Sequence, residues 1–133
     1  MDLIKFIGLP YKHRGASMDG CDCYGLVKLF YKDVMSVDLP DYQIMYSDTF
    51  DKEECSGVVA DVCGEWIEVD EPGFGSVLTF SIMGAICHVG IHIGDGDFVH
   101  SFNGTNSCIE SIRDISWNKR LHKAYEWQNK IQH

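Results

Sequence analysis

Apolar residues recur with helical spacing in the first third of the chain. Cys23, Leu26, Val27, Phe30 and Val34 fall at i, i+3, i+4, i+7 and i+11, which defines one face of a helix. Asp22 precedes this run and is a suitable N-cap, because its carboxylate can accept hydrogen bonds from the first backbone N–H groups of a helix. The pattern therefore predicts an amphipathic helix that begins at Cys23. A weaker helical pattern covers residues 51–63.

Beyond Pro72 the pattern changes to short, β-branched stretches separated by Gly, Asp or Asn. The stretches that predict strands are residues 77–80, 88–93, 98–101, 108–112 and 122–127. Helices followed by an antiparallel sheet indicate an α+β fold, with N-terminal helices packed on a C-terminal antiparallel sheet. The length of 133 residues suits one domain spanning residues 1–133.

Charge and hydropathy narrow the possible partners. The chain has 11 Lys and Arg against 20 Asp and Glu, a formal net charge of −9, which disfavours binding to nucleic acid. No run approaches the roughly 18 apolar residues of a membrane span, and the N-terminus does not resemble a signal peptide. We therefore expect synthesis in the cytoplasm, no membrane partner, and six reduced cysteines.

Cys23 is the first candidate for chemistry. Backbone N–H groups and the macrodipole at a helix N-terminus favour the thiolate over the thiol. The neighbouring Asp22 opposes this effect with its negative charge, so a nucleophilic Cys23 needs an imidazole partner.

Two neighbouring predicted strands carry histidines that could be that partner. Which histidines lie together depends on how the two strands pair. With Gly94-Asp95-Gly96 as a three-residue hairpin loop and Gly96 left-handed, Ile93 pairs with Asp97 and paired residue numbers add to 190. His88, Gly90, His92 and His100 then share one face, with His88 and His100 as diagonal neighbours. A two-residue loop would instead send His100 to the opposite face.

These residues together predict a Cys-His-His triad. Cys23 would attack a carbonyl, and His88 would take the thiol proton and return it to the leaving amine. His100 would hold the His88 ring by hydrogen bonding its second nitrogen. The Cys23 N–H is a natural oxyanion donor, joined by the Tyr11 hydroxyl.

Several motifs resemble the NlpC/P60 family of papain-like cysteine peptidases. Gly8-Leu9-Pro10-Tyr11 and the segment around Asp22-Cys23 match its G-x-P-Y and D-C-x-G-L/F-V elements, and Gly75 begins its G-D-L/V-V-x-F element with Ser76 in place of Asp. Residues 87–96 are similar to its H-V-G-I-Y-I-G-D-G strand, and residues 98–101 to its F-I-H-A strand. Tyr24 follows the cysteine as an aromatic residue does in compact bacteriophage and prophage tail members.

The resemblance implies a papain-like fold and hydrolysis of peptidoglycan stem peptides, commonly between D-glutamate and the diamino acid. It implies Cys23 as nucleophile, His88 as base and His100 as orienting residue, with Tyr11 beside the oxyanion site. Asp22 would hold the free amine of the stem peptide, Tyr24 would adjoin the substrate pocket, and no cofactor or metal is expected. It also implies other phage tail proteins as partners and a tail-associated location.

Other interpretations of the same residues remain open. Cys21, Cys23, Cys87 and His88 are suitable zinc ligands, although Cys21 and Cys87 also suit buried positions as small apolar side chains. The chain could be a tail-tip structural or assembly protein without hydrolysis, or an acyltransferase that uses the same thioester. His92 suits a structural place at the end of the sheet, and Trp66, Trp117 and Trp127 suit packing.

Overall fold

The computed structural model describes residues 3–12, 15–39, 66–82, 85–102 and 105–127, without the side chains of 85–87. A 3₁₀ turn, η1 (Ile4–Phe6), and a two-stranded sheet of β1 (Ala16–Ser17) and β2 (Gly20–Cys21) precede the helix α1 (Cys23–Phe30). A π-helical turn, η2 (Tyr31–Met35), continues α1. The helix predicted over residues 51–63 lies outside the described residues.

The helix α1 begins where its sequence predicts. The Asp22 carboxylate accepts a hydrogen bond from the Gly25 N–H at 2.7 Å, which confirms Asp22 as the N-cap. Leu26, Val27 and Phe30 are buried along one face, as the 3.6-residue period requires. The predicted helix over residues 23–34 is thus confirmed as α1 followed by η2.

Within the described residues, six strands form one antiparallel sheet in the order β3-β8-β4-β5-β6-β7. Their bounds are β3 (Trp66–Val69), β4 (Val77–Ile82), β5 (Ala85–Gly94), β6 (Asp97–His100), β7 (Cys108–Ser111) and β8 (Leu121–Trp127). All five predicted strands are present, and β3 is an additional one. The strand β8 lies between β3 and β4, so it joins β3 to the rest of the sheet.

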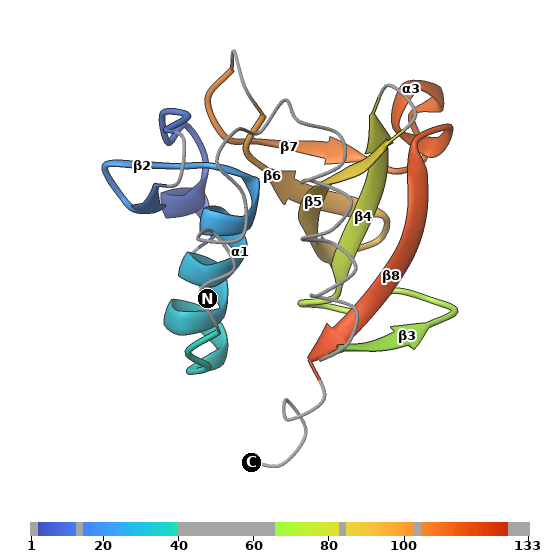
Figure 1. The fold of residues 1–133 in the computed structure, drawn as a ribbon, viewed down its shortest axis with the longest axis horizontal. Coiled ribbons are helices and arrows are strands. Elements are labelled where there is room, and N and C mark those ends of the chain that lie inside the picture. Colours follow the sequence, from blue (N-terminus) through green and yellow to red (C-terminus); the bar gives the residue numbers. More distant parts are fainter. Residues whose placement is uncertain (1–2, 13–14, 40–65, 83–84, 103–104, 128–133) are drawn as a thin grey trace.

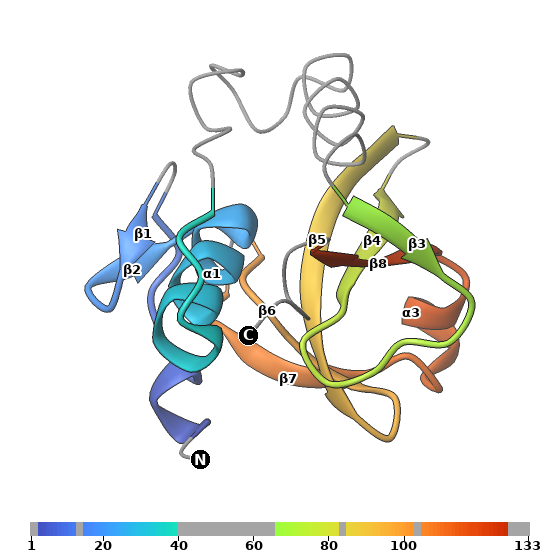
Figure 2. The same ribbon diagram turned by 90° about the horizontal axis from the view of Figure 1, so that it is seen from below.

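Helix and sheet form the predicted α+β arrangement. The helix α1 packs on β5 at one side of the molecule, while the short helix α3 (Ile115–Asn118) lies on the far side (Figures 1 and 2). One buried cluster joins α1 and η2 to the sheet, and a smaller one surrounds Phe80 and Trp117. Trp66, Trp117 and Trp127 are 6–8% exposed, which confirms their packing role. None of the described helices is long and apolar enough to cross a membrane.

The hairpin between β5 and β6 reaches the predicted register by a different route. Ile91 pairs with Val99 and His92 with Phe98, as predicted. The loop itself was predicted wrongly: it is a two-residue Asp95-Gly96 turn, with φ of 56° and 82°, closed by Gly94 and Asp97. A β-bulge between His92 and Gly94 takes up the extra residue, so His100 keeps its predicted face.

Candidate active site

Cys23 is the first residue of α1 and is partly exposed. The strand β2 leads directly into it: the Cys21 N–H donates to the Pro10 carbonyl, and the Asp22 N–H donates to the Gly15 carbonyl. Because the chain enters the helix from a paired strand, the position of the Cys23 backbone is fixed by contacts on both sides. A cysteine at this position experiences the positive end of the helix dipole.

A hydrogen bond joins the start of α1 to the end of β6. The hydroxyl of Ser101 donates to the Cys21 carbonyl at 2.8 Å, and both residues are fully buried. Ser101 follows His100, and Cys21 lies two residues before Cys23. This contact brings the segment that bears His100 to the segment that bears the candidate nucleophile.

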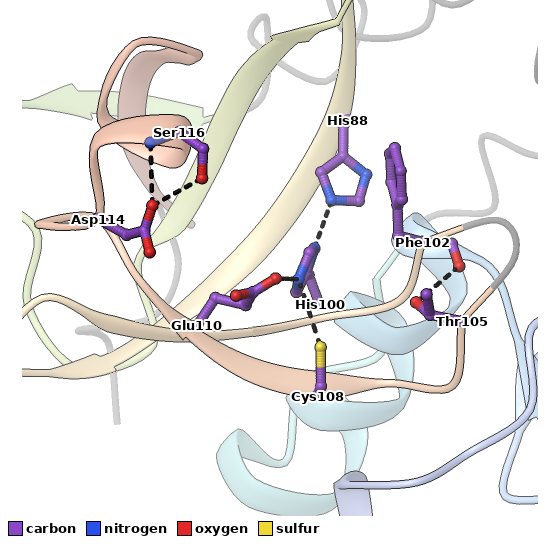
Figure 3. Close-up of polar contacts among 8 residues, drawn as sticks. All are labelled: His88, His100, Phe102, Thr105, Cys108, Glu110, Asp114 and Ser116. Atoms are coloured by element: carbon purple, nitrogen blue, oxygen red, sulfur yellow. Dashed lines mark hydrogen bonds and ion pairs between the residues drawn. The ribbon is translucent and has the colours of Figure 1, made fainter.

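His88 and His100 form a buried pair on neighbouring strands. His88 Nε2 lies 2.8 Å from His100 Nδ1, and the two side chains are 4% and 1% exposed (Figure 3). Gly90 permits this approach, because a Cβ there would lie 3.3 Å from the Cβ of His100. The predicted contact between the two rings is therefore confirmed.

Aromatic side chains enclose the pair. The ring of Trp117 has its centroid 5.9 Å from that of His88 and 4.8 Å from that of His100. Phe80 and Phe102 pack on His88 at 5.7 and 5.1 Å. These contacts restrict both imidazole rings and exclude water from them.

This environment keeps both histidines uncharged. Burial lowers the pKa of His88 well below its ordinary value, and the nearby His100 and Arg120 lower it further. Burial also lowers the pKa of His100, against the opposing effect of Glu110. A neutral His88 has a lone pair available at neutral pH, as a general base requires. Because His88 Nε2 bonds to His100, the nitrogen available for that role is Nδ1.

The three predicted substrate-side residues lie around the helix start. Tyr11 forms a parallel bridge with Cys21 and is partly exposed. Asp22 is fully buried and uses Oδ1 to cap the helix. Tyr24 is 5% exposed and belongs to the core cluster. The roles of these residues toward a substrate stay predictions.

His92 has a structural place, as its position at the end of the sheet suggested. Its Nδ1 lies 2.9 Å from the Gly73 carbonyl, and its Nε2 accepts from the Gly96 N–H at 3.0 Å. The side chain therefore connects the segment before β4 to the turn after β5.

Cys21 behaves as a buried thiol. It is fully buried, and burial raises its pKa to about 11, with a smaller contribution from Asp22. Cys21 is therefore a thiol at neutral pH, which confirms its interpretation as a small buried side chain. The side chain of Cys87, the remaining cysteine of the alternative zinc set, lies outside the described residues.

Two residues behind His100 were not identified from the sequence. His100 Nε2 lies 3.4 Å from Glu110 Oε2 and 3.6 Å from Cys108 Sγ (Figure 3). Both side chains come from β7, where Cys108 pairs directly with His100. Alternation along residues 108–112 places Cys108 and Glu110 on one face, but only the register between β6 and β7 places that face at His100.

A cysteine at a helix N-terminus, packed against an antiparallel sheet that carries a histidine, is the arrangement of papain-like α+β folds. The sequence profile of the NlpC/P60 family matches residues 8–126. The chain belongs to the NlpC/P60 family.

Curated relatives are 26–28% identical to this chain over the aligned segments. The murein DD-endopeptidase MepS/murein LD-carboxypeptidase of Escherichia coli K12 is 26% identical over 117 residues, covering 88% of this chain and 55% of that protein. Murein DD-endopeptidase MepH of the same strain is 28% identical over 121 residues, covering 88% and 40%. Protein P54 of Enterococcus faecium is 27% identical over 110 residues, covering 82% and 19%. The chain thus spans about half the length of these relatives or less.

Solved structures share the fold. The NlpC/p60 domain of peptidoglycan hydrolase SagA superposes with a TM-score of 0.62 at 22% identity, covering 92% of this chain and 91% of that one. An NlpC/P60 family protein from Bacillus cereus ATCC 10987 gives a TM-score of 0.67 at 24% identity, covering 92% and 36%. These structures confirm the predicted papain-like fold.

Proposed function

We propose that this chain is a cysteine peptidase that hydrolyses peptidoglycan stem peptides. The observation that carries the proposal is the 2.8 Å contact between His88 Nε2 and His100 Nδ1, because it orients a neutral imidazole on the sheet that adjoins the Cys23 helix. Family membership supports the same activity, since relatives of this chain are named as murein endopeptidases.

The proposed reaction first forms a thioester on Cys23 and then hydrolyses it. His88 Nδ1 takes the proton of the Cys23 thiol, and the thiolate attacks the peptide carbonyl. The Cys23 N–H and the Tyr11 hydroxyl stabilise the oxyanion of the tetrahedral intermediate. The proton on His88 passes to the leaving amine, which leaves a thioester on Cys23. Water then gives a proton to His88 Nδ1 and attacks the thioester, and that proton passes to the departing Cys23 sulfur, which releases the acid and restores the thiol.

His100 is a positioning residue in this scheme. His100 Nδ1 accepts the proton on His88 Nε2. This hydrogen bond selects the His88 tautomer in which His88 Nδ1 is unprotonated and can act as the base. When His88 becomes positively charged, the same hydrogen bond strengthens, because a charged donor binds an acceptor more tightly.

We further propose that the bond cleaved joins D-glutamate to the diamino acid, and that Asp22 attracts the free amine of the stem peptide. The Asp-Cys-aromatic sequence through Tyr24 supports delivery of this enzyme by a phage tail, with other tail proteins as partners. The net charge of −9 disfavours unaided attachment to anionic wall polymers, which is consistent with delivery by a larger assembly.

The test is digestion of purified peptidoglycan and of a defined stem peptide in the presence of a reductant, with products identified by mass spectrometry. We expect new free amines from the wild type and none from Cys23→Ala. His122→Asn is the matched control, because His122 is an exposed histidine on β8. Unfolding curves of each variant establish that the fold is intact.

The products separate the alternatives. Cleavage after D-glutamate supports the proposed bond, and cleavage between two D-amino acids corrects it to the bond named for the E. coli relatives. Transfer of the acyl group to an added amine identifies an acyltransferase. No product from folded wild type favours an assembly role, and full activity in Cys23→Ala refutes the nucleophile.

A further inference from the structure

A second group of chemically competent side chains lies behind His100, on the side of the ring opposite His88. His100 Nε2, Cys108 Sγ and a carboxylate oxygen of Glu110 all lie within 4.8 Å of one another. Figure 3 shows the thiol and the carboxylate both directed at the outer edge of the His100 ring. Neither Cys108 nor Glu110 has a part in the proposed hydrolysis.

The distances in this group are those of a metal coordination shell. In a tetrahedral zinc site, the ligand bond lengths place N and S about 3.5 Å apart and N and O about 3.3 Å apart. The observed separations are 3.6 Å from His100 Nε2 to Cys108 Sγ and 3.4 Å from His100 Nε2 to Glu110 Oε2. Two edges of the tetrahedron are therefore preformed.

The strands hold these ligands in place. Cys108 is the direct cross-strand partner of His100, and Glu110 follows two residues later on the same face of β7. His100 is 1% exposed and fixed by its contact with His88, whereas the Glu110 side chain is 38% exposed. A rigid inner ligand with an outer ligand at the surface gives a cation a path from solvent.

We propose that His100, Cys108 and Glu110 form an inhibitory binding site for a divalent zinc-like cation. Imidazole, thiolate and carboxylate are each ligands that Zn²⁺ takes in proteins. Glu110 supplies negative charge that attracts the cation, and the Cys108 thiol releases its proton to solvent on binding.

Inhibition follows from the positions of the protons, and this step rests on the proposed function. A metal at His100 Nε2 requires that nitrogen to be unprotonated, so the single proton of neutral His100 moves to Nδ1. His100 then donates to His88 Nε2 instead of accepting from it, and the proton of neutral His88 moves to Nδ1. That nitrogen can no longer take the Cys23 proton, although both rings remain neutral.

The binding test uses Co²⁺ as a spectroscopic probe in Cys23→Ala protein, so the candidate nucleophile cannot contribute. We expect one equivalent of Co²⁺ with a thiolate-to-cobalt charge-transfer band, displaced by Zn²⁺. Cys108→Ser should abolish the band, and Glu110→Gln should weaken binding at least tenfold. Glu68→Gln, which alters a surface carboxylate on β3, is the matched control.

The functional test compares each protein with itself, as the ratio of activity with and without Zn²⁺. The Zn²⁺ concentration for half-inhibition should rise at least tenfold in Cys108→Ser and stay unchanged in Glu68→Gln. An unchanged cobalt band in folded Cys23→Ala/Cys108→Ser overturns the site. Equal Zn²⁺ sensitivity of wild type and Cys108→Ser overturns the inhibition. The cobalt result stands independently of hydrolysis, so failure of the proposed function leaves the site testable.

Discussion

His88 Nε2 and His100 Nδ1 lie 2.8 Å apart, with both side chains at least 96% removed from solvent. One ring must donate and the other accept, so the pair shares a single hydrogen-bond direction at any moment. In the proposed reaction, the direction from His88 to His100 leaves His88 Nδ1 unprotonated, as a base requires. The reverse direction places the proton of neutral His88 on Nδ1, so this nitrogen could not accept a proton from Cys23.

Two replacements of His100 should show whether its hydrogen bond to the His88 ring affects kcat. His100→Ala leaves the His88 ring without an acceptor, and we expect kcat to fall about 10²-fold, the effect of misplacing a catalytic group. His100→Asn keeps an amide acceptor and should lose less. Measurement of kcat and KM on a defined stem peptide checks this order. Wild-type kcat in folded His100→Ala would exclude His100 as a positioning residue.

The histidine pair should make stability depend on pH. Both folded-state pKa values are lowered from 6.5, so the unfolded chain binds more protons than the folded one below that pH. The stability is fully present above pH 6.5 and is lost as the pH falls through the folded-state values. Each histidine contributes a slope of up to about 1.4 kcal/mol per pH unit.

Urea unfolding between about pH 7.5 and 5 measures this slope, a range in which most carboxylates stay ionised. The slope should decrease in His88→Asn and persist in His122→Asn. Equal slopes in these two variants would show that the buried pair does not carry the dependence.

A side chain at Gly90 should lower the stability of the fold. An added Cβ would lie 2.9 Å from Phe98 Cδ2 and 3.2 Å from the Val99 carbonyl oxygen, so the Phe98 ring or the β6 backbone must shift. We expect Gly90→Ala to lower the free energy of unfolding by about 1–3 kcal/mol, as overpacking does. Activity should fall as well, because the shift moves His100. Gly73→Ala is the control, since its added Cβ would find its nearest atom at 3.8 Å.

Asp22 combines a structural role with a proposed substrate role, and two substitutions distinguish them. Asp22→Ala removes the N-cap and should destabilise the fold by about 1 kcal/mol. Asp22→Asn keeps an acceptor for the Gly25 N–H and should stay close to wild-type stability. If its charge holds the substrate amine, KM should rise in Asp22→Asn. An unchanged KM there would restrict Asp22 to capping.

His92 should matter for stability and not for catalysis. His92→Phe leaves the Gly73 carbonyl and the Gly96 N–H without their partner, and we expect a loss of about 1–3 kcal/mol. Thermal unfolding and kcat measure the two effects. A large decrease in kcat at unchanged stability would instead place His92 in the reaction.

The sequence by itself determined the local elements. Asp22 before an apolar helical face predicts the start of α1, and the alternating stretches predict the strands, because capping and periodicity act over a few residues. The hairpin between β5 and β6 was also predictable, since it joins strands that are neighbours in sequence, although its register agrees with the prediction only because a bulge offsets the shorter turn.

Only the tertiary structure decided how distant segments meet. A two-residue turn with a bulge in β5 gives the same register as a three-residue loop without one. Nothing in the local sequence distinguishes these two arrangements. Insertion of β8 beside β4, and placement of Cys108 and Glu110 behind His100, depend on strand pairings that form between remote segments. Those pairings are selected by burial of the whole sheet, so the ligands of the proposed cation site were visible in the sequence only as an unremarkable strand.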